Sequence, residues 1–157
     1  MPLEANTLEA SIDIAATPAQ VWALVGDPRN MKRWSPQLVR SLGRGSEIAE
    51  GSKFFNINRK GAMVWPTQSM VIRYDPEREV AWRVKENWSI WALRLEPIEI
   101  DGKPGTRLSQ FREAPKGISD LSVTLTSRFL GGVPKFTAEL EDGMTTTLRR
   151  IKADIEG

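Results

Sequence analysis

The chain has 157 residues, with 22 Lys and Arg against 20 Asp and Glu, so its formal net charge is only +2. This length is typical of one domain with an adequate hydrophobic core, so we expect residues 1–157 to form a single domain. The chain has no cysteine and no histidine. Disulfides, thiolate nucleophiles, Cys or His metal sites and histidine-based triads are therefore excluded, and we expect no metal and no cofactor.

The basic residues are scattered along the chain rather than clustered, and with the small net charge they argue against a nucleic-acid partner. No apolar run approaches the ~18 residues of a membrane span. The N-terminus lacks the basic segment and apolar core of a signal peptide. We therefore expect a cytoplasmic protein, either a monomer or a dimer.

The first elements are predicted by alternation and by helix-start residues. Apolar and polar residues alternate over 8–14, which indicates a half-buried strand. Thr17, Pro18 and Gln20 then suit the cap, the first helical position and the capping box of a helix that ends near Gly26. Asp27 and Pro28 predict a second short helix by the same logic.

Strands separated by turn residues follow. We predict them near 37–42, 52–59, 63–74, 79–86, 89–96 and 105–113, with Asp101, Gly102 and Gly105 in the last loop. Short connections between consecutive strands favour an antiparallel meander. In the strand 63–74 both faces carry apolar residues, so the sequence does not choose the inward face.

The C-terminal region has the clearest pattern in the chain. From Val133 onward apolar residues recur every three or four positions, and they mark one stripe along a helix of about 33 Å. These residues are Val133, Phe136, Leu140, Met144, Leu148, Ile151 and Ile155. A helix this long at the end of a strand-rich chain must lie across the sheet to bury its stripe. We expect a hollow between the curved sheet and the helix.

The segment 117–130 fits either a β-branched strand or a short helix, and the helix is our prediction. Gly131 and Gly132 would end it, and Pro134 would open the last helix.

Several local motifs occur in this order along the chain. They are 16–22, 34–36, 51–54, 58–61 followed by Trp65, 75–76 with Ala81, Trp82 and Val84, 95–97, 105–107, and Gly143 and Met144 with Leu148. Together they resemble the START-related superfamily, also called SRPBCC or helix-grip proteins, in the branch labelled polyketide cyclase/dehydrase and lipid transport. The resemblance implies an α+β fold: a seven-stranded curved antiparallel sheet around a long C-terminal helix, with two short helices after the first strand and an apolar cavity. It does not imply one activity, because the superfamily contains carriers, receptors and cyclases.

Aromatic and aliphatic residues of the strands alternate so that one face of each strand meets the predicted helix. We expect the cavity to be lined by Trp65, Ser69, Trp82, Trp91, Leu93, Gln110, Phe136, Leu140 and Met144. The alternative is that the tryptophans simply fill the core. Further polar side chains that are candidates to point inward are Asn56, Asn58 and Arg112.

Gly143 lies in the middle of the last helix, where glycine costs about 1 kcal/mol relative to alanine. It makes room either for a ligand or for close helix–sheet packing. The charges of this helix, with Glu139, Glu141 and Asp142 before Arg149 and Arg150, complement the helix dipole.

The leading functional hypothesis is binding of a small hydrophobic molecule, such as a lipid, polyketide or isoprenoid. A cyclase or dehydratase in the same cavity is the first alternative, and the sequence names no catalytic residue for it. A regulatory or co-chaperone-like interaction module is the second. A buried carboxylate or an Arg–Glu pair at the cavity floor would favour the enzyme, and an all-apolar cavity would favour a carrier. A filled core with an exposed apolar surface would favour the interaction module.

Overall fold

A computed structural model describes residues 7–43, 45, 47–86, 88–113 and 133–157, the first five of the last range by their backbone only. The predicted helix within 117–130 lies outside these residues. The elements are β1 (Thr7–Ile14), α1 (Pro18–Val25), η2 (Pro28–Arg33), β2 (Leu38–Gly43), β3 (Lys53–Lys60), β4 (Met63–Asp75), β5 (Glu79–Val84), β6 (Ile90–Ile100), β7 (Lys103–Glu113) and α3 (Val133–Glu156).

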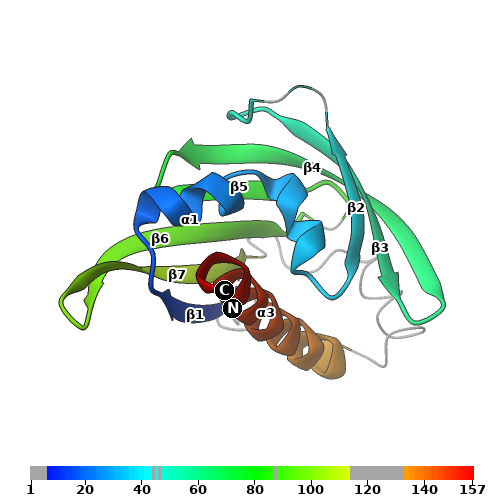
Figure 1. Ribbon diagram of the computed structural model, residues 1–157. Coiled ribbons are helices and arrows are strands. Elements are labelled where there is room, and N and C mark those ends of the chain that lie inside the picture. The colour runs from blue at the N-terminus through cyan, green and yellow to red at the C-terminus, as the bar shows by residue number, and fades with distance from the viewer. Residues whose placement is uncertain (1–6, 44, 46, 87, 114–132) are drawn as a thin grey trace.

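The described strands form one antiparallel sheet in the order β1-β7-β6-β5-β4-β3-β2. The predicted helix-grip architecture is confirmed: the sheet bends around α1, η2 and α3, and α3 lies along β1 and β7 (Figure 1). No helix within the described ranges is long and apolar enough to span a membrane.

The start of α1 follows the predicted capping box. Thr17 Oγ1 accepts a hydrogen bond from the Gln20 backbone N–H at 3.2 Å, and Gln20 Oε1 accepts one from the Thr17 N–H at 2.8 Å. The second short helix is a 3₁₀-helix capped by Asp27, whose carboxylate accepts from the Arg29 N–H at 2.9 Å. These two caps fix where α1 and η2, the two short helices that face the sheet, begin.

The structure settles the inward face of β4. Ser69 and Val71 are buried, so the face that carries Trp65, Thr67, Ser69 and Val71 points toward α3. A register shift between Val71 and Arg73 then returns Tyr74 to the inner side. Its ring lies 5.4 Å from that of Trp22. The extra residue of this bulge is why simple alternation fails at the end of the strand.

Three strand boundaries differ from the predictions. β5 ends at Val84 rather than 86, and β6 continues to Ile100 rather than ending at 96. Gly105 lies within β7 and not in the loop, because the hairpin turns tightly at Asp101 and Gly102, which both have positive φ. A Cβ at Gly105 would lie 3.1 Å from the Ile14 carbonyl oxygen. This glycine therefore marks a close approach of β7 to the end of β1.

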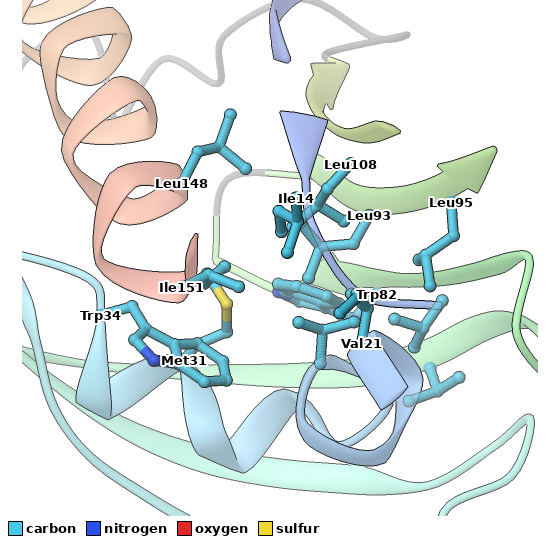
Figure 2. Packing of buried hydrophobic residues seen from close by; sticks show 14 of the residues in the cluster. Ile14, Val21, Met31, Trp34, Trp82, Leu93, Leu95, Leu108, Leu148 and Ile151 are labelled. Atoms are coloured by element: carbon cyan, nitrogen blue, oxygen red, sulfur yellow. The ribbon is translucent and has the colours of Figure 1, made fainter. Parts of the chain in front are cut away.

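The C-terminal half of α3 is packed into the main core. Leu148 and Ile151 are buried and reach from α3 toward the apolar side chains of the sheet and of η2 (Figure 2). Trp34 Nε1 donates a hydrogen bond to Asp154 Oδ2 at 2.9 Å. Glu156 Oε2 accepts from the Ala15 N–H at 2.7 Å, which lowers the pKa of this carboxyl below its ordinary value. This end of the helix is thus closed onto the sheet.

Candidate functional site

A cavity of about 150 Å³ lies beside the other half of α3. Its walls come from the inner face of the sheet, from the connection between η2 and β2, and from α3. The described residues that line it are Met31, Ser35, Pro36, Gln37, Leu38, Asn56, Asn58, Thr67, Trp82, Val84, Trp91, Gln110, Glu139, Leu140, Gly143, Met144 and Thr147.

One wall of the cavity is apolar. Trp82 of β5 and Trp91 of β6 are directly paired across the two strands, and both line the cavity together with Leu140 and Met144 of α3. Met144 is only 2% exposed, so its thioether faces the interior. Two flat indoles opposite flexible aliphatic groups suit an apolar ring or chain.

A second wall is polar, and its side chains are held in hydrogen bonds with neighbouring polar groups. Ser41 Oγ donates to Asn56 Oδ1 at 2.7 Å, and Asn56 Nδ2 donates to Ser69 Oγ at 3.1 Å. Asn58 Nδ2 donates to Thr67 Oγ1 at 3.0 Å. Because these hydrogen bonds hold the side chains in place, this wall is rigid. They also offset the free-energy cost of burying its polar groups.

The inner face of β7 carries two polar side chains of a different kind. Gln110 and Arg112 are 3% and 4% exposed, yet Gln110 Oε1 and Arg112 Nε are buried without a hydrogen-bond partner among the described residues. No carboxylate among the described residues forms an ion pair with Arg112. Burial lowers the pKa of its guanidinium from the ordinary value, but an arginine stays charged at neutral pH. The inner face of β7, beside the cavity, therefore carries a positive charge that no described acidic side chain compensates.

The cavity opens to the surface between α3 and the segment before β2. Pro36, Gln37, Glu139 and Gly143 line both the cavity and a shallow depression outside it. Lys60 at the end of β3 donates to the Glu139 carboxylate and forms an ion pair with it beside this opening. The contact gives Glu139 a role beyond the helix dipole, because it ties the described part of α3 that is nearest its N-terminus to the sheet.

Gly143 is not required by close packing. A Cβ placed there would meet Pro36 Cγ at 3.5 Å, an ordinary van der Waals distance. We expect Gly143→Ala to raise the free energy of unfolding by about 1 kcal/mol, the helix-propensity difference between the two residues. Urea unfolding measures this.

The matched control is Gly61→Ala in the turn between β3 and β4. Gly61 has a φ of 60°, a conformation that costs an L-residue about 1–2 kcal/mol. This variant should lose stability while Gly143→Ala gains it. A loss of stability in Gly143→Ala would mean that the helix approaches its neighbours more closely than the structure has it.

The cavity lining includes five of the nine residues expected from the sequence, namely Trp82, Trp91, Gln110, Leu140 and Met144. Ser69 lies behind the lining, hydrogen-bonded to Asn56. Trp65 shares the inward face but is not among the lining residues, and Leu93 is fully buried in the core with Ile14 and Leu108 (Figure 2). The side chain of Phe136 lies outside the described residues.

Sequence reasoning missed the lining contributed by Met31 and by the segment 35–38. The motif Trp34-Ser35-Pro36 was visible in the sequence, but nothing in it shows that the chain after η2 faces the first half of α3. The signal that would have found it is the need to cover the open side of the sheet between η2 and β2.

Comparison with known proteins places this chain in a family. A search of the curated proteins found no significant match. Among solved structures, a polyketide-cyclase-like protein from Corynebacterium glutamicum is similar with a TM-score of 0.65 and 28% identity, over 96% of this chain and 91% of that one. The Zhui aromatase/cyclase from a Streptomyces species is similar with a TM-score of 0.69 and 14% identity, over 96% of this chain and 93% of that one. A di-domain aromatase/cyclase of the steffimycin biosynthetic pathway has a TM-score of 0.67 and 10% identity, over 98% of this chain and 52% of its own.

At such identities the two aromatase/cyclases establish only a shared fold. The family itself rests on the sequence, because one family model matches residues 6–156. The chain belongs to the family described as polyketide cyclase / dehydrase and lipid transport.

Proposed function

We propose that the protein binds a small hydrophobic ligand, lipid-, polyketide- or isoprenoid-like, in the cavity between the sheet and α3. The observation that carries the proposal is the partly open space beside Trp82, Trp91 and Met144, which the described side chains leave unfilled. Its lining includes apolar side chains together with polar ones, and ligand pockets use apolar groups for contact and polar groups for orientation.

The volume of the cavity limits how much of a ligand it can hold. At about 150 Å³ it is smaller than the roughly 300–1,000 Å³ of pockets that bury drug-sized ligands. It matches an engineered cavity of about 150 Å³ in another protein that holds benzene. The enclosed part of the ligand is therefore about one ring in size, and a longer ligand would extend through the opening beside Pro36 and Gly143.

Indole N–H signals in ¹H–¹⁵N NMR test this function with p-cresol, a neutral ligand of one ring. We expect the signals of Trp82 and Trp91 to shift saturably, because both line the cavity. The signal of Trp88, which is 46% exposed and not a lining residue, serves as the internal control. Equal shifts of all indoles, or none, would contradict the proposal.

The cyclase or dehydratase alternative finds less support in the described residues. Proton transfer by a carboxylate at neutral pH needs a carboxyl whose pKa is raised by burial. Among the described lining residues the one carboxylate is Glu139, which is partly exposed and paired with Lys60. Binding without chemistry therefore fits the described lining better.

The interaction-module alternative rests on exposed apolar side chains of β2, β3 and β4. Leu42, Phe55 and Met70 are 51%, 45% and 37% exposed. A protein partner at this surface does not use the cavity, so it offers no reason for the cavity to stay open. The NMR titration separates the two, because p-cresol at this surface would shift neither Trp82 nor Trp91.

A further inference from the structure

Building on the proposed function, we propose that Gln110 and Arg112 form an acid-recognition site at the β7 side of the cavity, and that the ligand is a small aromatic hydroxy acid. Its carboxylate would accept from Arg112, its hydroxyl would donate to Gln110, and its ring would lie against Trp82, Trp91 and Met144.

The register of the sheet places these groups together. Trp82, Trp91 and Arg112 occupy one row across β5, β6 and β7, since Trp82 pairs with Trp91 and Trp91 pairs with Arg112. Gln110 lies two residues before Arg112 on the same face, about 6.6 Å away along the strand. Gln110 and Trp91 line the cavity. Arg112 is not itself a lining residue, but it lies next to both of them, on its own strand and on the neighbouring one.

The unpaired atoms specify the chemistry of the missing partner. Arg112 Nε–H is a donor and Gln110 Oε1 is an acceptor, and both are buried with no partner in the part of the chain that the structure describes. A buried polar group left unpaired costs free energy, and a buried charge costs more. A ligand that satisfies both atoms must present an acceptor to Arg112 and a donor to Gln110.

A carboxylate suits Arg112 better than a neutral oxygen. The guanidinium is buried, and no acidic side chain among the described residues compensates it. The planar fork of arginine matches a carboxylate in two parallel hydrogen bonds. The size limit of the cavity then favours a single ring as the apolar body. An aromatic acid with a separate hydroxyl meets all three conditions: a carboxylate for Arg112, a hydroxyl donor for Gln110 and a single ring as the apolar body.

Calorimetric titration of the wild-type protein with three ligands tests the proposal. The ligands are 3-hydroxybenzoate, benzoate and p-cresol, and the hydroxyl of the first cannot close an internal bond to its own carboxylate. We expect 3-hydroxybenzoate to bind about 10–150-fold more tightly than p-cresol, the range for a hydrogen bond to a charged group. Benzoate should bind about 2–12-fold more weakly than 3-hydroxybenzoate, the range for one neutral hydrogen bond.

Two variants assign the effects to the two side chains. Arg112→Met should reduce the affinity for both acids to that of p-cresol or below, since their carboxylate loses its partner. Stability should not fall, because the change removes an unpaired buried charge. Gln110→Leu should abolish only the difference between 3-hydroxybenzoate and benzoate. The matched control is Arg83→Met on the exposed face of β5, which should leave all three affinities unchanged.

The wild-type ligand series decides the proposal even where a variant fails to fold. If p-cresol binds and the acids bind no more tightly, the acid-recognition site is wrong while the cavity function stands. A preference for acids that survives in a folded Arg112→Met variant also overturns the assignment. If none of the three ligands binds, both the site and the proposed function are wrong.

Discussion

Replacing Trp34 by alanine is expected to lower the free energy of unfolding by about 3–5 kcal/mol, the usual cost of removing a large buried aromatic side chain. Trp34 is 1% exposed and belongs to the main core. Its Nε1 donates to Asp154 Oδ2 of α3 at 2.9 Å, so it joins the end of η2 to the C-terminal half of α3. Both the packing and this hydrogen bond are lost in the variant.

Urea unfolding followed by circular dichroism measures the loss. Trp34→Phe should cost less, because it keeps a ring in the core and removes only the indole donor. The control is Phe55→Ala, at a side chain that is 45% exposed on the outer face, where the change should stay within about 0.5 kcal/mol. A loss below about 1 kcal/mol in Trp34→Ala would show that α3 is not held to the sheet through this residue.

Replacing Met144 by tryptophan is expected to abolish uptake of a cavity ligand in a protein that remains folded. Met144 is 2% exposed and lines the cavity, so a larger side chain at this position enters the space that the ligand needs. Overpacking a filled core usually costs about 1–3 kcal/mol. Here the neighbouring cavity takes up much of the added volume, so the stability loss should be at the lower end.

Calorimetry with p-cresol measures the loss of binding. The control Arg149→Trp places the same side chain on an exposed position of the same helix and should bind like the wild type. Unchanged p-cresol affinity in a folded Met144→Trp variant would place the ligand somewhere else.

Local patterns in the sequence were sufficient for most of the architecture. Alternation over β1 and the capping box at Thr17 and Gln20 involve neighbouring residues, so they are visible without the fold. The apolar stripe of α3 likewise predicted the burial of Met144, Leu148 and Ile151. The inward face of β4 was not predictable, because its outer residues Val64 and Met70 are apolar as well and are exposed in the structure.

The candidate site was predictable only in part, because alternation along a strand does not show which residues of one face lie beside the cavity. Alternation places Trp91 and Leu93 on one face of β6, but it cannot tell that Trp91 borders the cavity while Leu93 lies in the closed core. The pairing of Lys60 with Glu139 joins positions 79 apart in sequence, and no local pattern signals it. The unpaired atoms of Gln110 and Arg112 become visible only when the described groups around them have been placed.

The division of α3 into two halves connects the fold to the proposed function. Around Leu148 and Ile151 the helix is buried in the core and tied to β1 and η2. Around Leu140 and Met144 it borders the cavity, and Glu139 is paired with Lys60 at its opening. The closed half supplies stability, and the other half leaves room for a ligand.

The most direct test of the central claim is the position of a bound ligand relative to the methionine methyl groups. With methyl-labelled methionine and p-cresol, we predict intermolecular nuclear Overhauser effects from the ring protons to the methyl of Met144, which lines the cavity together with Met31. Met70, 37% exposed on the outer face, should show none. Contacts to Met70 without contacts to Met144, or no contacts at a saturating ligand concentration, would contradict the existence of a ligand site between the sheet and α3.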